Sequence, residues 1–75
     1  MATHRQTMLR QVLEAIDAAG APVRDAELPA RAASFTQLCQ VAIDDAHGAG
    51  YVSWCESPAG WVLQPSGLEY LSTTP

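Results

Sequence analysis

The sequence predicts one small domain that is mainly α-helical with a single β-hairpin, an α+β fold. Apolar residues recur at helical spacing through the first two thirds of the chain and alternate with polar residues nearer its end. A composition of 48% hydrophobic and 16% charged residues favours a packed chain over a disordered one. At 75 residues the chain has room for one core. We place the domain over residues 1–75, with its core at about 3–72 and a frayed tail at 73–75.

The first helix is predicted between Thr3 and Gly20. Thr3 and Gln6 have the T-x-x-Q spacing of a capping box, in which the two residues satisfy free amides at a helix start. Gly20 and Pro22 form a typical stop, because glycine adopts the left-handed conformation and proline cannot continue a helix. The apolar residues expected on its inner face are Met8, Leu9, Val12, Leu13, Ile16 and Ala19.

Residues 22–33 predict a short extended piece at 22–24 and then a brief helix. Pro29 fits only the first turn of a helix, so we expect this helix to begin late or to be irregular. Leu28, Ala32 and Ala33 are expected to point inward.

A third helix is predicted over residues 34–47. Ser34 and Gln37 suggest a second capping box, and Gly48 and Gly50 end the helix. Asp44 and Asp45 fall in the last turns, where the helix dipole disfavours anions. The expected inner face consists of Phe35, Leu38, Cys39, Ala42, Ile43 and Ala46.

A hairpin is predicted next, with a four-residue loop at 57–60. This loop places Trp54 opposite Leu63 and Glu56 opposite Trp61, and it collects the apolar residues of both strands on one face, whereas a five-residue loop would split them. We expect both tryptophans to join the core, so Tyr51, on the other face, is the better candidate for exposure. Pro65 then starts a terminal helical turn that carries Leu68 and Leu71. The predicted buried face of the hairpin consists of Val52, Trp54, Trp61 and Leu63.

The order of these elements resembles that of the winged helix-turn-helix domains. Residues 46–52 (AHGAGYV) resemble the helix end, glycine and hydrophobic pair that lead from the recognition helix into the wing. Residues 61–71 (WVLQPSGLEYL) resemble the aromatic-x-Leu-Thr-x-x-Gly-x-x-x-Leu segment that closes the wing in bacterial regulators of the multiple-antibiotic-resistance and phenolic-acid-repressor type. The resemblance implies a three-helix core, a two-stranded wing and a short C-terminal helix, in a regulator of bacterial or phage type.

The sequence departs from that family where DNA contact is expected. Gln64 replaces the usual Thr or Ser helix cap, and the wing tip at 55–60 lacks the Arg or Lys that DNA-binding relatives commonly carry. Those relatives dimerise through helices additional to this module. All the helices predicted here belong to the module itself, so we expect a monomer or a weak homodimer. Residues 34–47, at the place of the recognition helix, contain no Lys or Arg.

The charge balance favours a protein partner over nucleic acid. The net charge is −4 and no lysine is present; residues 1–24 carry +1 and residues 25–75 carry −5. Because non-specific DNA affinity comes from cations that neutralise phosphates, an acidic body disfavours DNA and anionic membranes and suits a basic partner.

We therefore expect a non-enzymatic regulatory or adaptor module that binds a protein, such as a component of the transcription machinery. The alternative is a DNA-binding transcriptional regulator, in which Gln37 and Gln40 would bond adenine edges in the major groove and Arg24 and Arg31, with Arg5 and Arg10, would supply phosphate contacts. A third reading is a structural domain without a ligand of its own. The predicted partner-binding residues on the third helix and the wing are Thr36, Gln37, Gln40, Asp44, Asp45, Tyr51, Glu56 and Pro58.

No catalytic, cofactor or metal site is expected. Cys39, Cys55 and the two histidines have no zinc-site spacing, and the chain lacks a Gly-rich phosphate loop and a G-x-S-x-G elbow. Asp44 and Asp45 are adjacent, so on a helix they point about 100° apart and share a proton poorly. Neither a signal peptide nor a membrane-spanning stretch is recognisable, which predicts a cytoplasmic protein with reduced cysteines.

Overall fold

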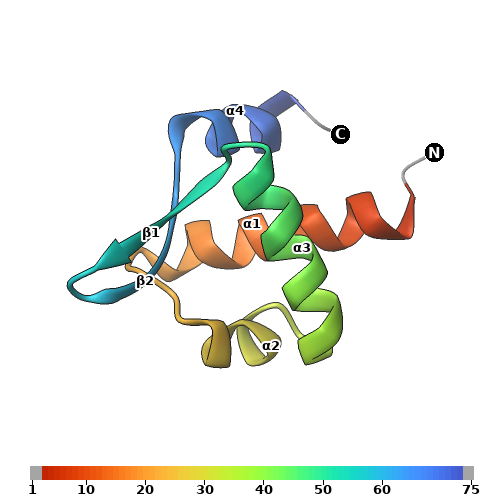
Figure 1. Ribbon diagram of the computed structural model, residues 1–75. Coiled ribbons are helices and arrows are strands. Elements are labelled where there is room, and N and C mark those ends of the chain that lie inside the picture. Colours follow the sequence, from red (N-terminus) through yellow and green to blue (C-terminus); the bar gives the residue numbers. More distant parts are fainter. Residues whose placement is uncertain (1–2, 74–75) are drawn as a thin grey trace.

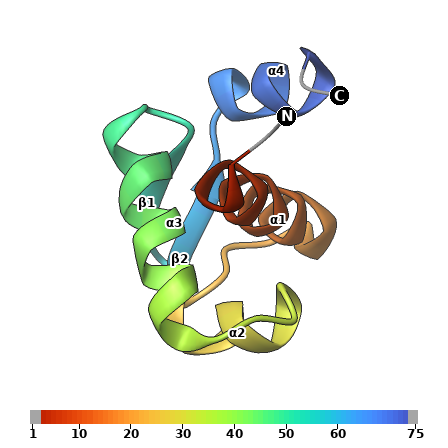
Figure 2. The same ribbon diagram turned by 90° about the vertical axis from the view of Figure 1, so that its right-hand side faces the viewer.

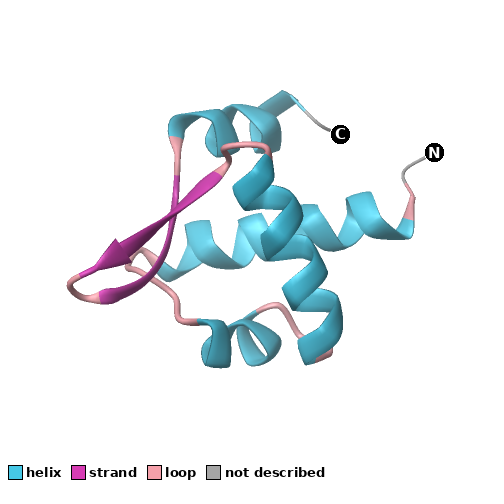
Figure 3. Cartoon of the chain, in the orientation of Figure 1, coloured by secondary structure: helices cyan, strands magenta, loops and turns pink. Residues whose placement is uncertain are grey.

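The computed structural model describes residues 3–73 and has four α-helices and a two-stranded antiparallel sheet. The elements in chain order are α1 (His4–Ala19), a 3-10 turn η1 (Asp25–Glu27), α2 (Leu28–Arg31), α3 (Thr36–Gly48), β1 (Val52–Glu56), β2 (Ala59–Leu63) and α4 (Pro65–Thr73). The predicted mainly helical fold with one hairpin is confirmed, and the layout is compatible with a winged helix (Figure 3).

The helices are arranged around α1. In Figure 1 α3 crosses α1, the hairpin projects to one side, and α4 and α2 lie above and below α1. Figure 2 looks along α1 and shows the same separation of α4 from α2, with β1 and β2 beside α3. The hairpin and α3 therefore frame one side of the molecule.

The first helix has both predicted ends. The Thr3 Oγ1 accepts a hydrogen bond from the Gln6 backbone N–H at 3.1 Å, and the Gln6 Oε1 accepts from the Thr3 N–H at 2.9 Å, which completes the capping box. Gly20 ends the helix at φ +66°, in the left-handed region that glycine adopts without a steric penalty.

The core lies between α1, α3, the start of α2 and the base of the hairpin. Most residues predicted to face inward are buried, and Val23, in the expected extended piece, joins them. Fully or nearly fully buried hydrophobic side chains in this cluster are Met8, Val12, Leu13, Ile16, Val23, Leu28, Cys39, Ala42, Ile43, Ala46 and Val52.

The expected extended piece at 22–24 fastens the hairpin to the helices. The Val23 N–H donates to the Trp61 carbonyl at 3.0 Å, and the Trp61 N–H donates to the Val23 carbonyl at 2.7 Å, so Val23 forms an isolated bridge to β2. Gly60 permits this approach, because a Cβ atom there would lie 2.6 Å from the Pro22 carbonyl carbon and 2.6 Å from the Val23 nitrogen. The Pro22–Arg24 segment can therefore pack this closely against β2 only because residue 60 has no side chain.

The hairpin register differs from the predicted one by two residues. Val52 pairs with Leu63, Trp54 with Trp61 and Glu56 with Ala59, so Ser57 and Pro58, joined by a cis peptide, form a two-residue turn. The predicted four-residue loop is wrong. The predicted face is nevertheless kept, because a shift of two residues leaves every side chain on the same side of a strand.

The start of α3 also differs from its prediction. The helix begins at Thr36 with Phe35 as the N-cap, and no side chain caps it. The Ser34 hydroxyl instead points to the Met8 sulfur at 3.5 Å, so the Ser34–Gln37 capping box does not form. Ala33 takes a left-handed φ of +53°, which turns its side chain outward and leaves Phe35 78% exposed. The predictions that Ala33 and Phe35 point inward are therefore wrong.

The C-terminal helix is longer than a single turn. It reaches Thr73, whose Oγ1 donates to the Glu69 carbonyl at 2.9 Å, so residue 73 is helical where a frayed tail was expected. Thr74 and Pro75, the rest of that expected tail, lie outside the described residues. Gln64 precedes the helix: its main-chain carbonyl accepts from the Gly67 N–H at 2.9 Å, and its side-chain amide donates to the Ser53 hydroxyl. These contacts join the start of α4 to β1.

Candidate functional site

The outward face of α3 carries neutral polar groups and a carboxylate. Thr36, Gln37, Gln40 and Asp44 are all exposed, as the sequence predicts for a helix whose inner face is apolar. Val41 lies among them and is 44% exposed. The helix contains no Arg or Lys, so the basic side chain that it carries is that of His47 in the last turn.

Asp45 lies on another side of α3 and is paired within the molecule. Its two carboxylate oxygens accept hydrogen bonds from Arg5 Nε and Nη2, each at 2.6 Å. These hydrogen bonds hold the pKa of Asp45 below its ordinary value and raise that of Arg5. The pair joins the start of α1 to the last turns of α3, which gives Asp45 a structural partner where the helix dipole alone would disfavour it. Asp44 is thus the freer of the two predicted carboxylates.

The four arginines are dispersed over the described part of the chain. Arg5 is held by Asp45, and Arg10 Nε lies 2.9 Å from Glu14 Oε1 while its Nη2 donates to the Leu71 carbonyl at 3.2 Å. Arg24, before η1, and Arg31, at the end of α2, are exposed. Two of the four guanidinium groups are therefore paired with carboxylates on α1 and α3. The four arginines do not form one continuous basic surface.

On the hairpin, the exposed aromatic residue is Trp54 and not Tyr51. Tyr51 is half-buried, and its ring stacks on that of Tyr70 with 4.8 Å between centroids. Trp54 is 45% exposed although it shares a strand face with buried Val52. The expectations that Tyr51 is exposed and that Trp54 joins the core are wrong. Glu56 and Pro58, near and in the turn, are exposed as expected of binding residues.

Trp54 belongs to a cluster of three rings, which we call the aromatic shelf: Trp54, Trp61 and His47. The Trp54 and Trp61 rings meet edge to face with centroids 5.2 Å apart, and the His47 ring lies 5.4 Å from that of Trp61. The Trp61 Nε1 donates to Asp25 Oδ1 at 2.6 Å, which fixes the central ring. The shelf therefore links the end of α3 to the middle of the hairpin, next to the outward face of α3.

Part of this shelf could be predicted from the strand pattern. Alternation correctly places Trp54 and Trp61 on one strand face, but it does not show how far each position lies from the core. Trp54 is two residues nearer the turn than Val52, and it is exposed whereas Val52 is buried.

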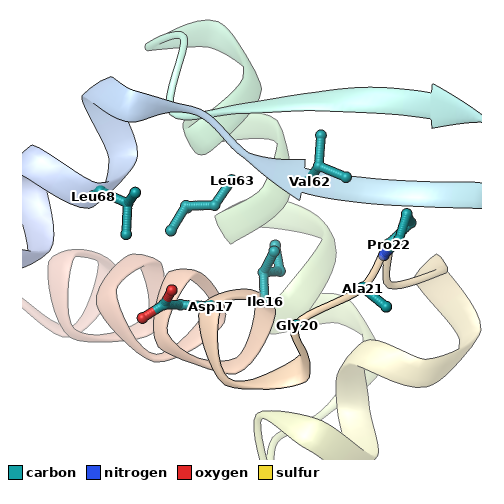
Figure 4. Close-up of a pocket in the computed structure, with 8 residues that line it drawn as sticks. All are labelled: Ile16, Asp17, Gly20, Ala21, Pro22, Val62, Leu63 and Leu68. Carbon is teal, nitrogen blue, oxygen red and sulfur yellow. The ribbon is translucent and has the colours of Figure 1, made fainter.

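Two shallow grooves lie elsewhere on the surface. One, of about 300 Å³, is lined by residues of α1, β2 and α4, and Figure 4 shows Asp17 as its only ionisable side chain. The other, of about 470 Å³, lies between α1 and the α2–α3 connection beside exposed Phe35, with His4 as its only titratable side chain. Neither groove brings together the pair of titratable groups that general acid–base catalysis uses.

The cysteines and histidines do not converge within residues 3–73, where no group of three or more metal-binding side chains is found. Cys39 is buried in the core, which raises the pKa of its thiol, and Cys55 on β1 is half-buried. No helix in this part of the chain is both long and apolar enough to cross a bilayer.

Comparisons with protein families, with curated proteins and with solved structures find no match for this chain. The resemblance to winged-helix regulators therefore stays a prediction that rests on the chain's own residues and element order. A function has to be argued from the surface that α3 and the hairpin form.

Proposed function

We propose that this chain is a non-enzymatic regulatory or adaptor module that binds a basic protein surface through α3 and the hairpin. One observation carries the proposal: the exposed face of α3 presents Gln37, Gln40 and Asp44 without any Lys or Arg. Glu56 adds a second exposed carboxylate on the hairpin. A surface of this charge attracts a cationic partner and repels phosphates.

The number of available arginines supports a protein partner over DNA. Proteins with a steep salt dependence on DNA make about 6–10 phosphate contacts. This chain has four arginines and no lysine, and Arg5 and Arg10 are engaged with Asp45 and Glu14. Arg24 and Arg31 would be left to oppose the repulsion from a segment of net charge −5.

The resemblance to bacterial and phage winged-helix regulators suggests where such a module acts. A basic component of the transcription machinery, in the cytoplasm, would suit the acidic surface, and the module would work as a monomer or a weak homodimer.

A capture experiment with charge reversal tests the proposal. The chain is immobilised, and the proteins that it retains are identified. The retention of each protein is then measured on the Asp44→Lys and the Asp17→Lys variants. Both aspartates are exposed, but Asp17 lines the groove between α1 and α4, so it is a matched control for charge. We expect a partner that Asp44→Lys loses and Asp17→Lys retains. Equal retention by the wild type and Asp44→Lys would contradict the proposal.

The second candidate is a DNA-binding transcriptional regulator, and the exposure of two glutamines favours it. Gln37 and Gln40 lie on the exposed face of α3, and glutamine can bond an adenine edge bidentately. This candidate predicts a retarded DNA band at about 50 mM salt that disappears steeply as salt rises. No retardation of any DNA under that condition would exclude it.

A further inference from the structure

The aromatic shelf leaves large rings in contact with solvent. Trp54 is 45% exposed and His47 is exposed, while Trp61 between them is partly buried. Large aromatic side chains usually bury most of their area in a core or an interface. The side chain of Trp61 is held by its hydrogen bond to Asp25, and its backbone is held by the bridge to Val23. The central ring of the shelf is therefore fixed in position.

One carboxylate bonds a shelf ring, and two others lie on the elements that carry the rings. Glu56 lies on the same hairpin face as Trp54, two positions nearer the turn. Asp44 precedes His47 by three residues on α3, which places the two on neighbouring positions of the helix surface. Asp25 accepts the Trp61 N–H. Arg24, the nearest cation in sequence to the Val23 bridge, lines a groove with Glu27, Pro58 and Ala59 that does not include the shelf rings.

We propose that the aromatic shelf binds an arginine side chain of a basic peptide segment in the partner protein. The guanidinium would lie against the exposed ring of Trp54, with Asp44 and Glu56 available to its N–H donors. Arginine fits this surface better than lysine because its planar group stacks on aromatic faces and still donates in its own plane. This inference rests on the proposed function and names the chemistry that the partner must offer.

A single-stranded nucleic acid is the other ligand that exposed aromatic rings can take, because bases stack on them. Such sites combine the rings with a positively charged groove that follows the backbone. Asp25, Asp44 and Glu56 outnumber Arg24, the one guanidinium that borders this end of the hairpin in the described residues, and this balance favours a guanidinium ligand over a phosphate chain.

The test uses a nine-residue peptide with three arginines spaced by glycine and serine, and the same peptide with citrulline, which keeps the shape of arginine without its charge. Binding is followed at about 50 mM salt, where electrostatic contacts are strong, through the NMR signals of the two indole N–H groups. We expect the arginine peptide to move the Trp54 signal saturably and to bind at least about 10-fold more tightly than the citrulline peptide, a difference of about 1.4 kcal/mol.

Substitutions then locate the site. We expect Trp54→Ala to weaken the arginine peptide at least about 5-fold and Trp54→Phe to stay within about 3-fold of the wild type, since phenylalanine keeps a ring face. Phe35→Ala is the matched control, because Phe35 is 78% exposed on a different groove and should leave binding unchanged. Unchanged methyl signals of the core residues Val12 and Leu13 in free Trp54→Ala establish that the variant is folded, because both are fully buried away from the Trp54 ring. If these signals change, Glu56→Gln, expected to weaken binding about 2- to 5-fold, replaces Trp54→Ala.

The results separate this inference from the function on which it rests. If Asp44→Lys abolishes peptide binding and Trp54→Ala does not change it, the shelf is not the arginine site although the acidic surface binds a basic partner. Equal affinity for the arginine and citrulline peptides would overturn the inference. Tighter binding of a twelve-nucleotide single strand than of the arginine peptide, with movement of the Trp54 signal, would overturn both.

Discussion

Replacing Gly60 by alanine should detach the hairpin from the segment that joins α1 to α2. An alanine Cβ at this position would lie 2.6 Å from the Pro22 carbonyl carbon and 2.6 Å from the Val23 nitrogen. Both are backbone atoms, so no side-chain rotation can relieve the overlap. Either Val23 or β2 has to move, and the two hydrogen bonds between Val23 and Trp61 would lengthen or break.

The size of the effect follows from those two hydrogen bonds. Each contributes about 0.5–1.5 kcal/mol net, so their loss predicts a decrease of about 1–3 kcal/mol in the free energy of unfolding. Overpacking in well-packed sites has the same typical range of about 1–3 kcal/mol. In a domain of this size each kcal/mol corresponds to a decrease in Tm of about 4–8 °C.

Urea denaturation and thermal melting, followed by circular dichroism, measure this change. Gly48→Ala is the matched control: nothing lies within 4 Å of a Cβ at Gly48, so we expect unchanged stability or a gain of up to about 1 kcal/mol. A Gly60→Ala variant within about 0.5 kcal/mol of the wild type would refute the packing of Val23 against β2.

Three further predictions concern other contacts. Thr3→Ala removes the α1 capping box and should lower the free energy of unfolding by about 0.5–2 kcal/mol in urea titration, whereas an unchanged midpoint would argue against the cap. Because Arg5 holds the pKa of Asp45 below 3.8, the stabilisation from this pair is present above that pH and is lost as pH falls through the lower folded value. Between about pH 5 and pH 2 the wild type should therefore lose more stability than Asp45→Asn, and parallel pH profiles would contradict the pairing. In thiol labelling of the native protein, Cys55 should react first, since Cys39 is 2% exposed and burial raises its pKa; simultaneous labelling would be inconsistent with a buried Cys39.

Features governed by local chemistry could be predicted from the sequence. The capping box at Thr3 and the stop at Gly20 depend on residues within a few positions of each other, and both form as expected. The inner faces of α1 and α3 follow from apolar spacing alone, because each helix has to bury one stripe.

Features set by tertiary geometry could not be predicted in the same way. Ala33 adopts a left-handed φ, which alanine rarely does, so no residue type signalled the sharp turn that displaces Ser34 and exposes Phe35. The period-two pattern of the hairpin fixes which face is buried but fits several registers that differ by two residues. The Arg5–Asp45 pair joins residues forty positions apart and has no sequence signature.

The candidate site shows the same division. The exposure of Gln37, Gln40 and Asp44 was predictable from helix periodicity, and the absence of Lys and Arg from that helix is plain in the sequence itself. The exposure of Trp54 was not, because it depends on where the covering helices end relative to the hairpin.

We propose that the surface of α3 and the hairpin attracts cations and repels phosphates. The most direct measurement is a pair of NMR titrations of the labelled chain at about 50 mM salt, one with duplex DNA and one with the arginine peptide. We expect saturable movement of the Asp44 amide and the Trp54 indole signals with the peptide, and no movement of either signal with DNA. Saturable shifts of the Gln37 and Gln40 amides with DNA, and none with the peptide, would contradict it.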